Sequence, residues 1–486
     1  MLSKLYLGVD LGTSSIKLSL ADESGVILDT ESRDYPLLLP KINWTEQNPD
    51  DWYISLIDAL KALHRRNDLS LVASLSFSGQ MHGLVILDKY DKVIRPAILW
   101  NDSRTEEEVD YLNDVIGKDV LLKETGNIAL CGFTAPKLLW LKKHEEANFQ
   151  RIAKIMLPKD YLAYRLTHVF ASDVSDLSGT LFFDVKNRCY SDYLLDVIGI
   201  QKYQLPAIKN SFDVIGTVLP AIARQVGLSE KTKVVMGGGD QAIGALGTAT
   251  IHEKEISISL GTSGTVFAPV DDYYFDPKGR VHSFRHATSK FHLMGCTLSA
   301  MGSLKWFLED VLHTTDFVTE LAEIPDRISD ILFLPYLTGE RSPINDPKAK
   351  GYLANLSLFY KREDIVKAVV EGICFSLYDV YKVMCELGLK VSSSRVIGGG
   401  SKSSKVLQIL ADIFAIDIKT ITTNDGGALG AIILAMVGDG LFDSIDEACK
   451  ALIKDKDIYH PDMDRHAIYE KKFKQYKELY LRNKNS

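Results

Sequence analysis

Asp240 stands where a strand, a run of three glycines and an apolar helix meet, in the stretch VVMGGGDQAIGALG. A carboxylate at such a point can act as a general base, taking a proton from a substrate hydroxyl as its oxygen attacks phosphorus. A positioned base contributes about 10²–10⁴-fold to rate. The glycines before it let another molecule approach the backbone closely. The same position also suits an aspartate that caps a helix N-terminus, and the residue types alone leave both roles open.

A second carboxylate, Asp10, follows the apolar run LYLGV and precedes a Gly-Thr-Ser turn. It can hold a Mg²⁺ ion that bridges nucleotide phosphates, because Mg²⁺ keeps most of its waters and uses few carboxylates. The alternative is a residue that only fixes the turn. The turn DLGTSSIKL recurs as SLGTSGTVF, from Ser259 to Phe267, about half the chain later. Two such strand–turn–strand elements predict a duplicated domain whose turns grip one polyphosphate, and only the first is preceded by a carboxylate.

Polar side chains also follow the buried strand LVASLSFSG, in QMHG and in the later stretch ILWNDSR. Met81, His82 and Trp100 combine hydrogen-bonding groups with an aromatic face, which suits a polyhydroxylated substrate. A lone histidine in this context also reads as a satisfied core residue. A third glycine run, Gly398–Gly400 in VIGGGSKSSKVLQIL, leaves room for a base or ribose beside a helix N-terminus, or serves only tight packing. It matches neither GxxxxGK[ST] nor GxGxxG.

These residues must be positioned by a chain of 486 residues, which predicts more than one domain. A net charge of −8 argues against a protein that coats nucleic acid and against binding to an anionic membrane surface. The six cysteines show no metal-ligand spacing, and no signal peptide is recognised. The longest charge-free apolar stretch, GGALGAIILAMVG, is too short to span a bilayer and predicts a buried helix. We therefore expect a cytoplasmic protein with no nucleic-acid or membrane partner.

Strand and helix signals alternate along the chain, which favours mixed sheets with helices on their faces. Three antiparallel strands open the chain, a helix follows at PDDWYISLIDALKALHRR, and the pattern restarts at EISISLGTSGTVFAPV. We expect an N-terminal lobe over 1–249, a C-terminal lobe over 250–440 and a charged helical segment over 441–486. The fold class expected is α/β, with two lobes of mixed β-sheet and a ligand cleft between them.

Taken together, the chain resembles the FGGY carbohydrate kinases of the actin-like ATPase superfamily. LGVDLGTSSIKLSL and SISLGTSGTVF are similar to the two phosphate hairpins of that superfamily, and GFTAPKLLWLKKH, from Gly132 to His144, is similar to the family's own first signature. Within the family, segments such as SGQMHGLVILD, MLPKDYLAYRLT and FLPYLTGERSP are similar to those of the xylulokinase subfamily. The match runs from residue 5 to about 440.

The resemblance implies an ATP- and Mg²⁺-dependent phosphorylation of a ketopentose, most simply D-xylulose to D-xylulose 5-phosphate. Asp240 would be the base and Asp10 the acidic residue at the metal. A small-molecule sugar and ATP would be the ligands, in a possible homodimer. The remaining site residues implied are Met81, His82, Trp100 and Gln241 for the sugar, and Gly12, Thr13, Ser14, Gly261, Thr262, Ser263, Gly399 and Gly400 for ATP.

Two positions depart from the family pattern and bear on the choice of sugar. Gln241 stands where several xylulokinases have asparagine, although glycerol-phosphorylating members also carry glutamine. Asn355 replaces a glycine of the second signature, and asparagine can keep the turn because it tolerates positive φ. D-ribulose, gluconate or glycerol are the alternative substrates, and an actin- or chaperone-like ATPase acting on a protein partner is the alternative class.

Overall fold

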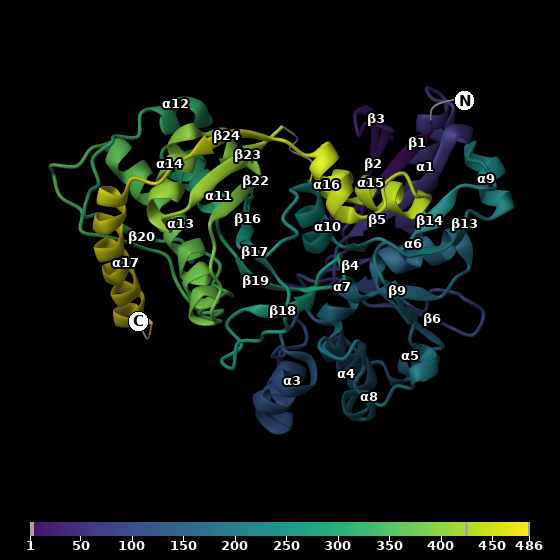
Figure 1. Ribbon diagram of the computed structural model, residues 1–486. Helices are drawn as coiled ribbons and strands as arrows, with labels where there is room; N and C mark the ends of the chain where they lie inside the picture. Colours follow the sequence, from purple (N-terminus) through teal and green to yellow (C-terminus); the bar gives the residue numbers. More distant parts are fainter. Residues whose placement is uncertain (1–3, 423–425, 485–486) are drawn as a thin grey trace. The chain divides into compact units, whose positions relative to one another are not determined.

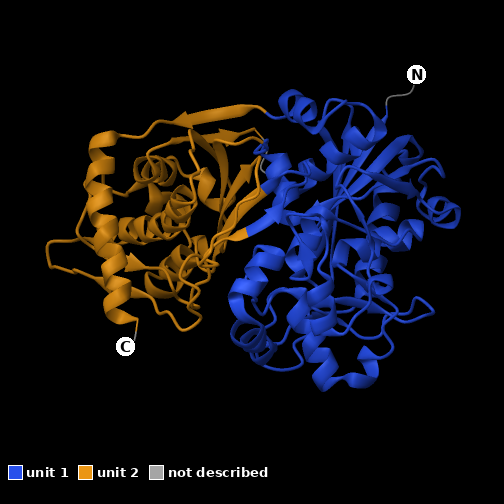
Figure 2. Cartoon of the chain, turned by 60° about the horizontal axis from the view of Figure 1, so that its bottom comes forward, with its two compact units in different colours: residues 1–251, 283–291, 425–453 blue, residues 252–282, 292–424, 454–486 orange. Residues whose placement is uncertain are grey.

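The chain folds as two compact units, each built on its own mixed β-sheet (Figures 1 and 2). The structure is a computed structural model that describes residues 4–422 and 426–484. Unit 1 comprises residues 1–251, 283–291 and 425–453, and unit 2 comprises 252–282, 292–424 and 454–486. Both units therefore consist of segments from distant parts of the sequence.

The main sheet of unit 1 has the strand order β13-β14-β5-β1-β2-β3. The first three strands form an antiparallel meander, and β1 and β14 each lie parallel to β5. The parallel strands end together, at Leu11 of β1 and at Gly79 of β5, so that the residues after them share one edge of the sheet. The strands are β1 (Leu5–Leu11), β2 (Ser15–Asp22), β3 (Ile27–Asp34), β5 (Val72–Gly79), β13 (Val214–Thr217), β14 (Lys233–Val235) and the short β15 (Gly238–Gly239), which pairs with β5.

Helices cover both faces of this sheet. On one face α1 (Pro49–His64) packs Trp52, Leu56 and Leu60 into the core; Asn48 caps it and Pro49 opens it. The other helices are α2 (Glu106–Asp110), α3 (Lys118–Thr125), α4 (Thr134–His144), α5 (Glu146–Phe149), α6 (Pro158–Thr167), α7 (Val174–Leu177), α8 (Asp192–Ile198), α9 (Pro220–Val226), α10 (Asp240–Gly247), α15 (Gly426–Asp439) and α16 (Ile445–Leu452).

On the other face α15 crosses β1 and β5 and packs against α10. Its apolar residues Ile432, Ala435 and Met436 close over Tyr6 of β1. The two helices approach so closely that a Cβ at Gly430 would lie 2.0 Å from the Ile243 carbonyl oxygen. The expectation that GGALGAIILAMVG forms a buried helix is thus confirmed over Gly426–Asp439.

Four two-stranded ribbons complete unit 1. One of them, β4 with β7, reaches the edge of the sheet where β1 and β5 end, through hydrogen bonds from Gln47 and Trp100 to Thr13. The ribbons are β4 (Glu46–Gln47) with β7 (Ala97–Ile98), β6 (Val85–Leu87) with β8 (Lys154–Met156), β9 (Ala171–Asp173) with β12 (Ala207–Lys209), and β10 (Phe183–Asp184) with β11 (Cys189–Tyr190).

Unit 2 repeats the strand order of unit 1. Its sheet runs β18-β19-β17-β16-β22-β23-β24, again with an antiparallel hairpin, β16 and β17, next to strands parallel to β16, while β20 and β21 pair separately. The strands are β16 (Glu255–Leu260), β17 (Gly264–Val270), β19 (Phe291–Thr297), β20 (Leu332–Leu334), β21 (Tyr352–Ala354), β22 (Ser393–Ile397), β23 (Asp417–Ile421) and β24 (Asp455–Tyr459). Strand β18 (His282–Arg285) spans the point where the segments 252–282 and 283–291 meet.

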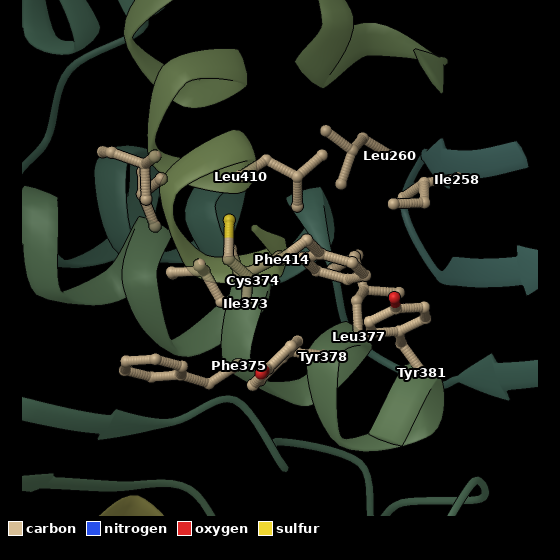
Figure 3. Close-up of a cluster of buried hydrophobic side chains, with 14 of the residues drawn as sticks. Ile258, Leu260, Ile373, Cys374, Phe375, Leu377, Tyr378, Tyr381, Leu410 and Phe414 are labelled. Atoms are coloured by element: carbon tan, nitrogen blue, oxygen red, sulfur yellow. The ribbon is translucent and has the colours of Figure 1, made fainter. Parts of the chain in front are cut away.

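The core of unit 2 lies between this sheet and its longest helix, α13 (Arg362–Glu386) (Figure 3). Leu377, Tyr378 and Tyr381 of α13 meet Leu410 and Phe414 of α14 beneath the sheet residues Ile258 and Leu260. The stacked rings of Tyr381 and Phe414 have centroids 5.1 Å apart. The helices are α11 (Met301–Trp306), α12 (Phe317–Ala322), α13, α14 (Ser404–Phe414) and α17 (Met463–Asn483).

The observed architecture confirms the expected fold class, α/β with two sheet-containing lobes. The segments of the two compact units do not coincide with the expected limits 1–249, 250–440 and 441–486. The division into domains at those limits stays a prediction. Residues 425–453 complete unit 1 because α15 supplies one cover of its sheet. The segment expected to be a helical tail is divided, with α16 in unit 1 and β24 and α17 in unit 2.

Candidate active site

Asp240 is the first residue of α10 and follows directly on β15. Burial raises the pKa of its carboxyl to about 7, and the negative charge of Asp10 adds to that shift; hydrogen bonds from the backbone and side chain of Gln241 offset part of it. Its side chain is still partly accessible. A carboxyl with a pKa near neutrality is suited to accept a proton, because its base form is populated and basic at working pH.

Asp10 lies near the end of β1, paired in register with Lys17 of β2 and Ser78 of β5. The first turn of α15 lies against its carboxylate: a Cβ at Gly427 would be 3.1 Å from Asp10 Oδ2. The glycine therefore avoids a tight contact between a side chain at this position and the Asp10 carboxylate. The N-terminal end of a helix also favours a negative charge beside it.

The metal predicted at Asp10 can be tested against the donors present. Within residues 4–422 and 426–484, no group of three or more His, Cys, Asp or Glu side chains is arranged to hold a metal ion. One carboxylate fits Mg²⁺, which binds chiefly through waters and substrate phosphates, and fits poorly with a metal that needs a full set of protein ligands. Asp10 is therefore a candidate for that ion alone.

Met81 and His82 follow β5 at the same edge of the sheet. Met81 lies against the peptide that precedes Asp240, because a Cβ at Gly239 would be 2.8 Å from Met81 Sδ. His82 has a positive φ of 68°, and its Nδ1 is 2.8 Å from the Gly179 carbonyl oxygen. Its ring lies 4.9 Å, centroid to centroid, from Phe133 of the GFTAPKLLW segment. Met81 thus lies beside Asp240, and His82 lies beside the signature segment.

The buried Lys137, from the same signature, holds the backbone at His82 in place. Its Nζ donates to the carbonyl oxygens of His82 and Gly132, at 2.8 Å each. Desolvation lowers its pKa to about 7. Sequence reasoning did not single out Lys137, although a lysine inside an apolar helix pattern was a usable signal.

Thr13 and Trp100, expected at the phosphates and near the sugar respectively, are joined to each other. The indole Nε1 of Trp100 donates to Thr13 Oγ1 at 2.9 Å. Unit 1 therefore gathers the predicted residues Asp10, Thr13, Trp100, Asp240 and Gln241 with Met81 and His82 at one edge of its sheet.

In unit 2 the second Gly-Thr-Ser turn and the third glycine run border one pocket of about 680 Å³. Of the residues predicted to bind ATP in this unit, Gly261, Thr262 and Gly399 line the pocket, whereas Gly400 is buried beneath Leu260 and Ser263 is exposed outside the lining. Apolar side chains form much of the remaining wall. Residues that sequence reasoning missed in this wall are Met301, Gly302, Lys305, Phe317, Val318, Leu321 and Ala322.

Such a pocket suits a flat, partly apolar group with polar substituents. Its lining includes Lys305, Lys402 and Lys405, and the ammonium group of Lys405 pairs with Asp326 at 2.7 Å. The missed residues lie on the helices α11 and α12, which are six residues long each. Helices this short do not show a recognisable hydrophobic period in the sequence.

Comparisons with known proteins agree with this arrangement. Residues 5–247 match the FGGY family of carbohydrate kinases, N-terminal domain, and residues 256–438 match the C-terminal domain of that family. The xylulose kinase of Bacillus subtilis is 37% identical over 99% of this chain and 98% of its own. The chain belongs to the FGGY family of carbohydrate kinases.

Solved structures of two carbohydrate kinases superpose on nearly the whole chain. The ligand-bound xylulose kinase of Lactobacillus acidophilus superposes with a TM-score of 0.95 at 28% identity, covering 99% of each chain. The gluconate kinase of the same organism gives a TM-score of 0.94 at 28% identity, covering 98% of this chain and 97% of its own. This protein is therefore a carbohydrate kinase, an enzyme that uses ATP to phosphorylate a small-molecule sugar.

Proposed function

We propose that the protein transfers the γ-phosphoryl group of ATP to the terminal hydroxyl of D-xylulose, forming D-xylulose 5-phosphate and ADP. The observation that carries the proposal is Asp240, a carboxyl whose pKa is raised to about 7 at the start of α10. The full-length similarity to a named xylulose kinase supports the choice of sugar.

In this mechanism the sugar lies against Met81 and His82 and its terminal hydroxyl faces Asp240. The Asp240 carboxylate takes the hydroxyl proton while the oxygen attacks the γ-phosphorus, and the bond from that phosphorus to the β,γ-bridging oxygen breaks to release ADP. Gln241, which hydrogen-bonds the carboxyl, orients it. Such transfers depend mostly on positioning and on charge stabilisation, so the base has only to orient the hydroxyl and accept its proton while other groups stabilise the phosphate charge.

The phosphates are proposed to bind at the Gly-Thr-Ser turns, Gly12–Ser14 in unit 1 and Gly261–Ser263 in unit 2. The base and ribose of ATP are assigned to the pocket bordered by Gly399 in unit 2. Asp10 is the residue proposed to hold Mg²⁺, which when bound supplies positive charge to the phosphate oxygens. A homodimer and a cytoplasmic location remain predictions.

A coupled ADP-release assay with xylulose, ribulose, glycerol and gluconate tests the proposal. We expect xylulose to stimulate ADP release most, and Asp240→Asn to reduce kcat by about 10²–10⁴-fold. Asp192→Asn is a matched control, because Asp192 is also the first residue of a helix, α8, but its side chain is 76% exposed. Equal turnover of Asp240→Asn and wild type would remove Asp240 from the mechanism.

Gluconate is the second candidate substrate, because a gluconate kinase superposes nearly as well as the xylulose kinase. A kcat/KM for gluconate above that for xylulose would replace the proposed sugar while leaving the role of Asp240 intact.

A further inference from the structure

The first Gly-Thr-Ser turn has the carbonyl groups of Gly12 and Thr13 held by side chains. The Gly12 carbonyl oxygen accepts from the Tyr35 hydroxyl and from Gln80 Nε2, the latter at 3.3 Å. The Thr13 carbonyl oxygen accepts from Gln47 Nε2 at 2.6 Å. Since a trans peptide is planar, each carbonyl points opposite to the N–H of the following residue. The N–H groups of Thr13 and Ser14 are therefore turned away from these three side chains.

Successive N–H groups turned to one side of a turn form a binding site for an anion. Across the part of the chain that the structure describes, neither the Thr13 nor the Ser14 N–H donates to a protein acceptor. The turn is closed by its own backbone, since the Gly12 N–H donates to the Ser15 carbonyl oxygen at 3.0 Å. The three side chains add to this closure, because they hold the Gly12 and Thr13 carbonyl groups on the side opposite to the two donors.

Gln47 comes from the two-stranded ribbon β4·β7, and Trp100 follows the second strand of the same ribbon. Gln47 is 1% exposed, and its Oε1 accepts from Trp52 Nε1 at 3.0 Å and from Gln80 Nε2 at 3.1 Å. Those two donors fix the amide so that its nitrogen faces Thr13. One ribbon therefore supplies both side chains that hold Thr13, Gln47 to its carbonyl and Trp100 to its hydroxyl.

The ribbon is held rigid by buried charges. Arg104, whose side chain is fully buried, bridges Glu46 of β4 at 2.6 Å and Asp102 at 2.7 Å. Asp102 in turn accepts from the Thr45 backbone N–H at 2.6 Å. Charge-assisted bonds of this length are the strong ones, so Gln47 and Trp100 are presented on a braced support.

The second turn, in unit 2, achieves the same orientation with backbone groups alone. The Gly261 carbonyl accepts from the Met301 N–H at 2.9 Å, and the Thr262 carbonyl accepts from the N–H groups of Ala300 and Gly302 at 2.9 and 3.0 Å. The carbonyls at equivalent positions are held in both turns. Among the residues that the structure describes, side chains hold these carbonyls in the first turn and backbone N–H groups hold them in the second.

We propose that the β4·β7 ribbon orients the first phosphate turn and that Gln47 and Trp100 are positioning residues for the phosphates of ATP. The indole N–H of Trp100 is committed to the Thr13 hydroxyl, which leaves that hydroxyl's proton available to a phosphate oxygen. Trp100 thus acts on the nucleotide side of the reaction. The proposal rests on the proposed function in taking the ligand of the turn to be ATP.

The test is Gln47→Glu, which keeps the acceptor for Trp52 and Gln80 and replaces the donor that faces Thr13. Gln204→Glu is the matched control: Gln204 Nε2 also donates to a loop carbonyl, that of Ile152, at 2.7 Å, and its Oε1 also accepts a neighbouring N–H. We expect Gln47→Glu to lower kcat/KM for ATP by about 10–100-fold with the KM for sugar within about twofold of wild type. Gln204→Glu should change neither constant.

Trp100→Phe and Thr13→Val form a double-mutant cycle on the second contact. Each should raise the KM for ATP, and the double variant should be no worse than the stronger single variant, because both remove one hydrogen bond. A rise in the sugar KM with an unchanged KM for ATP in Trp100→Phe would overturn the proposal, as would a Gln47→Glu enzyme that matches Gln204→Glu.

Nucleotide binding without sugar separates the two proposals. The ratio of ATP to AMP affinity, measured by calorimetry on the full chain, should fall about tenfold in Gln47→Glu and stay unchanged in Gln204→Glu. An unchanged ratio in both variants overturns the positioning role. A wild-type enzyme that no sugar stimulates overturns the proposed function, while a lowered ratio in Gln47→Glu would still support the role of the ribbon.

Discussion

Burial of the Asp240 carboxyl disfavours its charged form, and the resulting rise in pKa suits its proposed role as a base. Its pKa is raised above the ordinary value, to about 7, so the native state binds a proton there more tightly than the unfolded chain does. Between pH 4 and pH 7 the unfolded state loses that proton first, and stability contributed by this site therefore falls as the pH rises.

We therefore expect Asp240→Asn to raise the melting temperature at pH 8 relative to wild type, with the difference vanishing near pH 4, where both side chains are neutral. Thermal unfolding of the ligand-free enzyme at both pH values measures this. A variant that is destabilised at pH 8 and not at pH 4 would show that the Asp240 carboxylate is stabilised in the fold.

The activity should show the same ionisation. Since Asp240 must be deprotonated to act as a base, kcat/KM for the sugar should fall below pH 7 with an apparent pKa near 7. Asp10 raises that pKa through its negative charge, so Asp10→Asn should move the acidic limb of its residual activity to lower pH. A limb that moves to higher pH, or a profile that is flat between pH 6 and 8 in the wild type, would contradict the assignment.

At the scale of elements, a buried group of charges lies behind the active-site edge of unit 1. Lys159 of α6 bridges Asp160, Asp173 and Asp176 at 2.6, 3.0 and 3.4 Å, with all four side chains fully buried. Desolvation raises the pKa of Asp176 well above its usual range. Asp173 also accepts from Ser175 Oγ, which in turn accepts from the Gly239 N–H beside the base at 3.1 Å.

Removing the one cation of this group leaves buried carboxylates without a counter-charge. We expect Lys159→Met to destabilise the protein by about 3–5 kcal/mol in urea unfolding. Lys143→Met is the control, because the Lys143–Glu107 ion pair is exposed, 55% and 78% respectively, and should cost at most about 1 kcal/mol. Similar losses in the two variants would mean that the buried group is not held by Lys159.

Two glycine-to-alanine substitutions test the close crossing of α10 and α15. Gly430→Ala should destabilise the protein, because its Cβ would meet the Ile243 carbonyl oxygen at 2.0 Å and push the helices apart. Gly244→Ala, in α10 with open space around it, should instead stabilise by about 0.4–1 kcal/mol through helix propensity. Denaturant unfolding of both variants gives the sign directly, and equal signs would refute the close crossing.

Local patterns predicted the elements well and the site in part. The strand–turn–strand repeats, the helix begun by Pro49 and the apolar helix at Gly426–Asp439 all carry their own period or capping residues, and all are present. Gln47 and Gly427 gave no such signal. Their importance comes from what lies against them in space, the Thr13 carbonyl and the Asp10 carboxylate, and those contacts join residues 34 and about 400 positions apart.

The association of residues 425–453 with unit 1 was missed for the same reason. An apolar helix pattern shows that a helix is buried but not which sheet buries it. Tyr6 and Ala21 of the first hairpin supply that surface, and they precede α15 by more than 400 residues.

At the scale of the whole molecule, unit 1 cannot be separated by cutting the chain near residue 250. Such a fragment lacks α15 and exposes the apolar face of β1 and β5. We expect residues 1–250 expressed alone to aggregate, and a fragment of 1–250 joined by a short linker to 425–453 to be monomeric and folded. Size-exclusion chromatography and circular dichroism measure this, and a folded fragment 1–250 would contradict the structural role of α15.

The described helices include none that is both long and apolar enough to cross a membrane.

The discontinuity of unit 1 also affects the folding of the chain during its synthesis. Since synthesis proceeds at about 5–20 residues per second, roughly 10–40 s separate residue 251 from residue 453. The face of the unit 1 sheet that α15 covers therefore stays exposed during that time. Nascent chains of this protein are thus expected to depend on chaperones until residues 425–453 have been made, well after the strands of the unit 1 sheet have left the ribosome.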